Sequence, residues 1–359
     1  MKIIHCADLH LDSTIGGLTT EKSRLRKEEI LHTFERLCEY ATLNKVSVVL
    51  ICGDLFDSDK ITLKTKERIF AAIKKCNNTE FLYLSGNHDE KNKFLSLENL
   101  PTNIKFFTND WTYFNYNNII IAGAIIENND FSILARSLNL SENSINIVAL
   151  HGEIVGYVSN AKAELISIPQ LKDKNINYLA LGHYHSYAEG KIDNRGKFVY
   201  SGCLDGRGFD EIGEKGFVEI EINEGGKLTN KFIPFASRSF FVENYNVENE
   251  TNFFEAIDNI LNILKNKYQQ SSLIKLVLVG EHSADFNIDL YAINEKLKDH
   301  FFFVKVYDKT QLKIKLEDFE FDKSIKGEFV RTVLSSKLTE EDKKKVILLG
   351  LRTLKGEDV

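Results

Sequence analysis

Along the first two-thirds of the chain, short apolar runs alternate with amphipathic patterns of helical period, and this alternation constrains the fold more than any other feature. The apolar runs at 1–7, 46–52 and 81–85 each stop at polar residues or at glycine, as buried strands do. Between them, apolar residues recur at helical spacing over 23–44 and 61–76. Further strands are predicted at 119–124, 145–150 and 177–181. The order β-α-β-α-β predicts a layered α/β fold.

The pattern changes after His185, where shorter strands are separated by glycine turns. These strands are predicted at 187–191, 197–201, 216–222 and 227–235. Pro234 and the segment that follows it mark a boundary, beyond which helices at 252–267 and 289–298 alternate with strands at 273–280 and 301–307. Two amphipathic helix patterns complete the tail, one with Phe329–Leu334 and one with Ile347–Leu354 as apolar stripes. We therefore predict three domains, at 1–236, 237–322 and 323–359.

Composition excludes several classes of protein. The chain has 359 residues, 43% of them apolar and 27% charged, which are ordinary globular values. No apolar run approaches the roughly 18 residues of a membrane span, and the first residues do not resemble a signal peptide. The five cysteines are scattered, with no CxxC pair, so we expect buried thiols rather than disulfides. A net charge of −6 gives no bulk attraction to nucleic acid. These features predict a soluble cytoplasmic protein with no membrane partner.

Polar clusters stand where five of the predicted strands end. The clusters are Asp8-Leu9-His10, Gly53-Asp54-Leu55-Phe56-Asp57, Gly86-Asn87-His88-Asp89, His151-Gly152 and Gly182-His183-Tyr184-His185. They contain five of the nine histidines. The carboxyl ends of strands in an open α/β sheet are where ligands bind. The glycines before Asp54, Asn87 and His183 allow close approach of the backbone.

This set of side chains is typical of a metal centre with two ions. Two carboxylates, one amide oxygen and four imidazoles are too many ligands for one tetrahedral zinc ion. They match two adjacent divalent ions that share a bridging carboxylate, and mixed oxygen and nitrogen ligands suit manganese, iron or zinc. A single such aspartate or histidine is more often a turn former or a satisfied polar residue, but five clusters in this order argue against chance. The other histidines (His5, His32, His282, His300) are interpreted as structural or surface residues.

The ordered motifs DxH, GDxxD, GNHD, H and GHxH, which span residues 1 to about 205, resemble the calcineurin-like metallophosphoesterase superfamily. The opening motifs and the stretch 200–216 resemble its SbcD branch, and in particular the YhaO-like DNA repair exonucleases. The resemblance implies a four-layer α/β/β/α metallophosphoesterase sandwich with a smaller α+β capping domain and a helical C-terminal tail. It implies that one metal is held by Asp8, His10 and His185, the other by Asn87, His151 and His183, and that Asp54 bridges both. His88 would protonate the leaving oxygen, and Asp57 would orient His88.

The same resemblance implies a DNA nuclease with two divalent ions, manganese first and iron or zinc as alternatives. It implies a homodimer whose capping domain binds DNA and whose tail binds an SMC-like coiled-coil ATPase of the SbcC or YhaN type. Two other functions stay open: a small-molecule nucleotide phosphodiesterase or phosphatase, and a scaffold that regulates the ATPase. Local alternatives also remain, because Asp57 could cap the helix before Ile61. Lys305, Lys309, Lys313 and Lys315 could line a phosphate groove or a solvated strand face, and Phe301–Phe303 could stack on bases or fill a core.

Overall fold

The computed structural model describes residues 1–13, 15–57, 61–86, 100–126, 131–156, 164–283, 286–313 and 319–354. The chain divides into two compact units, Met1–Phe241 and Val242–Val359. No helix of the described ranges is long and apolar enough to cross a membrane. The three domains expected from the sequence, at 1–236, 237–322 and 323–359, stay predictions.

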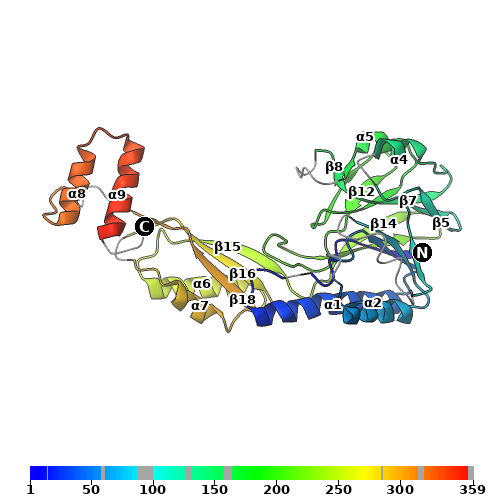
Figure 1. The fold of residues 1–359 in the computed structure, drawn as a ribbon, viewed down its shortest axis with the longest axis horizontal. Coiled ribbons are helices and arrows are strands. Elements are labelled where there is room, and N and C mark those ends of the chain that lie inside the picture. The colour runs from blue at the N-terminus through cyan, green and yellow to red at the C-terminus, as the bar shows by residue number, and fades with distance from the viewer. Residues whose placement is uncertain are drawn as a thin grey trace. The chain divides into compact units, whose positions relative to one another are not determined.

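One six-stranded sheet of the first unit carries the N-terminus. Its order is β14-β13-β1-β2-β3-β4, and β1 to β4 run parallel. The strands are β1 (Lys2–Cys6), β2 (Val48–Cys52), β3 (Glu80–Leu84), β4 (Ile104–Phe106), β13 (Gly216–Ile222) and β14 (Leu228–Pro234). Helices α1 (Thr20–Leu43) and α2 (Leu63–Lys75) lie side by side along its outer face (Figure 1). The sheet therefore combines the early parallel strands with a late antiparallel hairpin.

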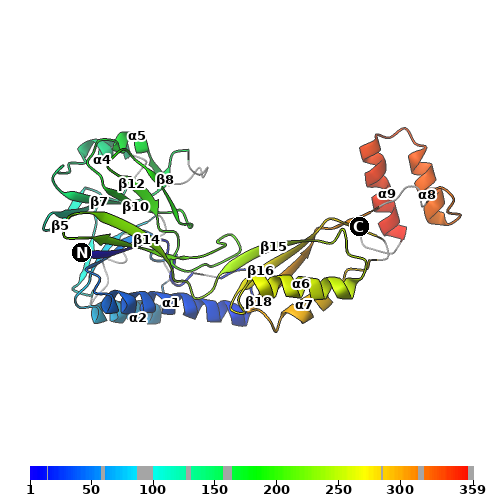
Figure 2. The ribbon, with the colours of Figure 1, turned by 180° about the vertical axis from the view of Figure 1, so that it is seen from behind.

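A second six-stranded sheet has the order β11-β12-β10-β7-β6-β5. Its strands are β5 (Thr112–Tyr116), β6 (Ile119–Gly123), β7 (Ile145–His151), β10 (Tyr178–Gly182), β11 (Ala188–Lys191) and β12 (Lys197–Tyr200). Helices α4 (Phe131–Ser137) and α5 (Ile168–Leu171) cover its outer face (Figure 2). The two-residue strands β8 (Glu153–Ile154) and β9 (Leu165–Ile166) pair beside it.

Three apolar cores separate these layers. Phe34 and Ile51 belong to the core between the helices α1 and α2 and the first sheet. Val48 and Ile147 belong to the core between the two sheets, and Leu179 belongs to the core beneath α4 and α5. Alternate residues of one strand pack in different cores, because successive side chains point to opposite faces of the sheet. The predicted four-layer α/β/β/α sandwich is therefore confirmed.

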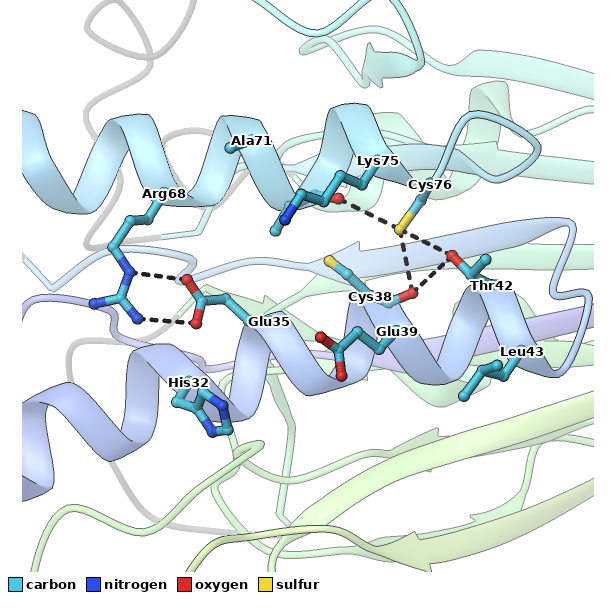
Figure 3. Close-up of a pocket in the computed structure, with 11 residues that line it drawn as sticks. His32, Glu35, Cys38, Glu39, Thr42, Leu43, Arg68, Ala71, Lys75 and Cys76 are labelled. Carbon is cyan, nitrogen blue, oxygen red and sulfur yellow. Dashed lines mark hydrogen bonds and ion pairs between the residues drawn. The ribbon is translucent and has the colours of Figure 1, made fainter.

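The helices α1 and α2 also enclose a groove of about 620 Å³ (Figure 3). Arg68 of α2 forms two hydrogen bonds with Glu35 of α1, at 2.8 Å each. Farther along the groove, the Cys76 thiol donates to the Cys38 carbonyl at 3.2 Å. Of the described residues, those that line this groove include no predicted metal ligand. All five cysteines are buried thiols, as predicted.

The second unit contains a three-stranded sheet of order β15-β16-β18. The first two residues of β15, Phe240 and Phe241, still belong to the first unit. Its strands are β15 (Phe240–Asn246), β16 (Leu273–Val279) and β18 (Phe303–Asp308), and α6 (Phe253–Lys267) and α7 (Leu290–Leu297) pack on one face. Strands β17 (Glu281–His282) and β19 (Gln311–Leu312) form a separate pair. Phe301 lies in the core, so the core interpretation holds for the first of the three phenylalanines.

The tail forms two helices, α8 (Ile325–Leu334) and α9 (Glu340–Leu354). Their apolar stripes pack on each other, since Val330 and Val333 form one buried cluster with Ile347 and Leu351. Gly350 permits this contact, because a Cβ atom there would lie 2.1 Å from the Phe329 ring. These residues of the two stripes therefore cover each other. Two amphipathic helices joined by a short turn bury their apolar faces against each other first.

Candidate metal centre

The predicted polar clusters meet because the strands that carry them are parallel neighbours. Strands β1 and β2 pair in parallel in the first sheet, and β7 and β10 do so in the second. The loops that follow β1 and β2 are also bonded to each other, since the amide of His10 donates to the carbonyl of Asp54 at 2.9 Å. The amide of His183 reaches across to the other sheet and donates to both carboxylate oxygens of Asp8, at 2.9 and 3.1 Å. The backbone thereby joins three clusters into one site.

One ligand group consists of Asp8, His10 and His185, whose ligand atoms lie within 4.8 Å of one another. The Nε2 atoms of His10 and His185 are 3.3 Å apart. Their Nδ1 atoms face carboxylates, Asp57 at 3.1 Å and Glu211 at 2.8 Å. The Glu211 contact is a hydrogen bond donated by His185 Nδ1, whereas the Asp57 contact is a close approach to His10 Nδ1, and the two Nε2 atoms face each other. Such a pair requires a shared proton or a cation, and a cation with nitrogen and oxygen ligands fits here.

A second group consists of Asp8, Asp54 and His151, also within 4.8 Å. The Nδ1 atom of His151 donates to the carbonyl of Cys52 at 2.9 Å. Its Nε2 atom is buried and has no hydrogen-bond partner among the described residues, and it lies 3.4 Å from Asp54 Oδ2. Burial lowers the pKa of His151, but Asp54 and Asp8 outweigh burial and raise that pKa to about 9. A metal ion at this site would replace the proton on Nε2.

Asp54 stands between the two groups. Its Oδ2 atom lies 3.7 Å from His10 Nε2 and 3.4 Å from His151 Nε2. Asp8 belongs to both groups, so both carboxylates are placed to contact either ion. The residues present therefore fit two adjacent divalent ions, as a buried set with several oxygen and nitrogen ligands does.

The other predicted site residues have different positions. The His183 ring lies beside His151, with ring centres 5.5 Å apart, but it belongs to neither ligand group. Burial and the neighbouring His151 lower the pKa of His183, which favours the neutral ring that a metal ion binds. Asn87 and His88 lie outside the described residues. The roles of these three residues stay predictions, as do those of the other predicted ligands.

Asp57 is not the cap of the helix predicted over 61–76, so that alternative is wrong. Helix α2 begins at Leu63, and its cap is Thr62, whose hydroxyl accepts from the amide of Thr65 at 3.2 Å. Asp57 Oδ1 instead lies 3.0 Å from Arg207 Nη1 and 3.1 Å from His10 Nδ1. Its predicted contact with His88 falls on a residue outside the described ranges.

Several of the predicted ligands have a strained backbone. Asp8, His10, Asp54 and His183 all have positive φ, at 52°, 44°, 50° and 97°. Residues other than glycine adopt this region rarely, at a cost of order 1–3 kcal/mol each, and they concentrate at functional sites. The strain is offset by the hydrogen bonds between the loops.

Two glycines leave space for these side chains. A Cβ atom on Gly182 would lie 1.9 Å from the Cys52 carbonyl oxygen and 2.7 Å from His151 Nδ1. A Cβ atom on Gly86 would lie 2.2 Å from Asp54 Oδ1. The expectation that glycines permit close approach at the strand ends is confirmed at both positions, because any side chain there would displace a ligand.

Sequence reasoning missed Arg207 and Glu211. Both lie in the loop between β12 and β13, within the stretch 200–216, whose pattern indicated only a likeness to the YhaO-like subgroup. Burial raises the pKa of Glu211, but His185 and Arg207 outweigh it and hold that pKa far below its usual value. Charged residues at positions i and i+4 of a glycine-rich loop were the available signal, and such a signal is weak by itself.

Comparison with known proteins agrees with this geometry. The sequence profile described as calcineurin-like phosphoesterase matches residues 1–187, more than half of the chain. The metallophosphoesterase YhaO of Bacillus subtilis is 25% identical over 243 residues, which are 63% of this chain and 58% of that protein. A subunit of the nuclease SbcCD of Staphylococcus saprophyticus is 26% identical over 270 residues, 65% of this chain and 69% of that one. The DNA double-strand break repair protein Mre11 of Methanosarcina acetivorans is 24% identical over 275 residues, which are 73% of this chain and 43% of that protein.

The chain thus spans less than two thirds of the length of YhaO and of Mre11. Members of the matched family bind two divalent metal ions, and the two ligand groups around Asp8 are the candidate positions for them. The chain belongs to the calcineurin-like phosphoesterase family.

Proposed function

We propose that the protein is a two-metal phosphodiesterase that cleaves DNA, as the nuclease subunit of an SbcCD-like repair complex. The observation that carries the reaction type is the pair of ligand groups that share Asp8. The choice of DNA is supported by the names of two relatives, a nuclease subunit and a DNA break repair protein. Manganese is the proposed metal, with iron or zinc as alternatives, because the ligands mix oxygen and imidazole nitrogen.

In this proposal, Asp8, His10, Asp54, Asn87, His151, His183 and His185 hold the two ions. Two bound divalent ions offset the charge of a phosphodiester and lower the pKa of a bound water. Asp54 and Asp8 keep negative charge between the ligand groups, and the Nε2 atoms of His10 and His151 face Asp54. His88 donates a proton to the leaving oxygen. Asp57 orients His88.

The first test is cleavage of end-labelled duplex and single-stranded DNA by the purified protein with Mn²⁺. We expect Mn²⁺-dependent cleavage that falls by about 10²–10⁴-fold in His88→Ala, the usual contribution of a general acid. Hydrolysis of bis-p-nitrophenyl phosphate is measured in parallel. If nucleotide diesters are hydrolysed and DNA is not, the protein is a small-molecule phosphodiesterase and the DNA proposal fails. His88→Ala with wild-type activity would remove the assignment of the acid.

A basic and aromatic cluster on the second unit supports DNA as a substrate. Lys275 of β16 and Lys305 of β18 are opposite each other in the parallel register. Their Nζ atoms lie 5.0 and 5.2 Å from the centre of the Tyr307 ring. The neighbouring positions Ile274 and Val304 pack in the core beneath the helices, so this cluster is on the opposite face of the sheet. Lysines bind phosphates and an aromatic ring stacks on a base, as in single-strand binding surfaces.

The double variant Lys275→Ala, Lys305→Ala is expected to bind single-stranded DNA with a weaker salt dependence. Each phosphate contact contributes about 0.7 to the slope of log K against log salt, so the slope should fall by about 1.4. Fluorescence anisotropy with a labelled oligonucleotide, in an Asp54→Asn background that does not cleave it, measures the slope. Lys296→Ala on α7, whose partner is Asp258, is the matched control. An unchanged slope in the double variant would contradict the assignment.

The tail helices are the proposed contact for an SMC-like coiled-coil ATPase of the SbcC or YhaN type, and the first unit is the proposed dimer contact. Although the two stripes pack on each other, Phe321 is 84% exposed, Ile325 77% and Leu349 53%. Large exposed apolar side chains mark interaction surfaces. This scaffolding role adds to hydrolysis rather than replacing it.

Deletion of residues 324–359 is expected to abolish co-purification with the ATPase and to leave the hydrolysis of bis-p-nitrophenyl phosphate within about twofold. The physical reason is that α8 and α9 bury their stripes mainly on each other, so the deletion removes a self-contained cluster. Size-exclusion chromatography and circular dichroism check that the shortened chain folds. Full retention of ATPase binding would contradict the assignment, and loss of folding would show that these helices belong to the core.

A further inference from the structure

A cluster of three charged residues lies behind the ligand pair His10 and His185, on the side away from their Nε2 atoms. It consists of Asp57, which follows β2, and of Arg207 and Glu211 from the loop before β13. We call these three residues the outer cluster. Asp57 and Arg207 are 150 positions apart in the chain, so their contact exists only in the folded protein.

The Glu211 carboxylate is held in place by hydrogen bonds within the outer cluster and to His185. It is 3% exposed. One carboxylate oxygen, Oε1, accepts from His185 Nδ1 at 2.8 Å and from Arg207 Nη2 and Nε at 2.7 and 3.1 Å. The other oxygen accepts from the Arg207 backbone amide at 2.7 Å. A carboxylate held by four donors cannot rotate without losing charge-assisted hydrogen bonds, so it fixes the plane of the His185 ring.

Arg207 joins Glu211 to the second carboxylate. Its Nη1 donates to Asp57 Oδ1 at 3.0 Å, and the same oxygen lies 3.1 Å from His10 Nδ1. One guanidinium therefore holds two carboxylates, each of which faces the Nδ1 atom of one ligand imidazole. The planar fork of arginine can make these contacts together, whereas the single ammonium of a lysine cannot.

The two ligand groups are supported differently. His185 donates a hydrogen bond to the Glu211 side chain, and the Nδ1 atom of His10 lies 3.1 Å from the Asp57 side chain. His151 depends on the backbone carbonyl of Cys52, which no side-chain substitution removes. Carboxylates that accept from a ligand histidine fix its tautomer and its orientation, and their loss lowers metal affinity by about 10–100-fold.

We propose that Asp57, Arg207 and Glu211 are positioning residues that set the affinity of one of the two metal sites, the one built from Asp8, His10 and His185. The inference rests on the proposed two-metal function and names residues that control metal affinity at that same centre. The site that contains His151 keeps its affinity when the outer cluster is changed. The imidazole His185 of one site is therefore oriented by a side chain, and the imidazole His151 of the other by a backbone carbonyl.

The test measures bound metal rather than activity. Protein purified with Mn²⁺ is dialysed against buffers of graded free Mn²⁺, and the metal bound per chain is determined by elemental analysis. For the unmodified protein we expect a plateau at two ions. In Glu211→Gln, filling of one ion should require about 10–100-fold more free Mn²⁺, with the other unchanged. Electron paramagnetic resonance should then show an isolated Mn²⁺ ion where the unmodified protein shows a coupled pair.

Two further variants keep the test decisive. Asp57→Asn addresses the same site through His10, and its side chain is 31% exposed, so it serves if Glu211→Gln does not fold. Glu189→Gln changes an exposed, hydrogen-bonded carboxylate of the same unit and should bind metal normally. Equal weakening of both ions, or of neither, would overturn the inference. If the unmodified protein binds fewer than two ions, the proposed two-metal function itself fails, which is a distinguishable result.

Discussion

Replacing Asp54 by asparagine is expected to lower phosphodiester hydrolysis by about 10³-fold or more while the protein remains folded. Asp54 is 2% exposed, and its Oδ2 atom lies within 3.7 Å of His10 Nε2 and 3.4 Å of His151 Nε2. The substitution removes the charge between the two ligand groups with little change of shape. Charge stabilisation by metal ions contributes several kcal/mol to such reactions, and about 4 kcal/mol corresponds to a factor of 10³.

Asparagine is the informative substitution because of the backbone. Asp54 has a φ of 50°, and asparagine tolerates this region better than alanine does. Asp173→Asn is the matched control, since Asp173 has a φ of 59° and lies outside both ligand groups. Turnover of bis-p-nitrophenyl phosphate and bound metal per chain are the measurements. A variant that keeps more than a tenth of the activity would show that Asp54 does not bridge the ions.

The second large effect is expected for the stability of the first unit, in Arg26→Met. The side chains of Arg26 and Asp205 are both 0% exposed, and their ion pair has a distance of 2.6 Å. Arg26 also donates to the carbonyl of Gly206 at 2.8 Å and to Glu29 at 2.7 Å. Removal of the guanidinium leaves the Asp205 carboxylate buried without its cation. Breaking such a pair lowers the free energy of unfolding by about 3–5 kcal/mol.

Urea denaturation followed by circular dichroism measures this change. Lys64→Met is the control, because its pair with Glu28 is 73% and 55% exposed at the side chains and should contribute at most about 1 kcal/mol. The double variant Arg26→Met, Asp205→Leu should recover much of the loss, since no buried charge remains. The recovery will be incomplete, because Thr33 and Ser237 also donate to Asp205. An Arg26→Met protein as stable as the control would contradict this account.

Local patterns predicted most of the helices and strands. The strand expected at 46–52 is Val48–Cys52, and the strand expected at 273–280 is Leu273–Val279. Helix α1 begins at Thr20 rather than at Ser23, because its first turn is polar and is stabilised by Thr19, whose hydroxyl accepts from the Lys22 amide. Apolar periodicity starts only where a helix begins to be buried, so it cannot locate a solvated first turn.

The sequence by itself determined the layered α/β fold and the side chains that gather at the strand ends, among them Asp8, Asp54 and His151. It could do so because periodicity and the position of a polar cluster after a strand are properties of a few consecutive residues. Only the tertiary structure decided that Arg207 joins Asp57 to Glu211, that Arg26 is buried against Asp205, and that the tail stripes cover each other. Those contacts join segments that come together only on folding. No local pattern predicts which distant charged residue or apolar face a given side chain will contact.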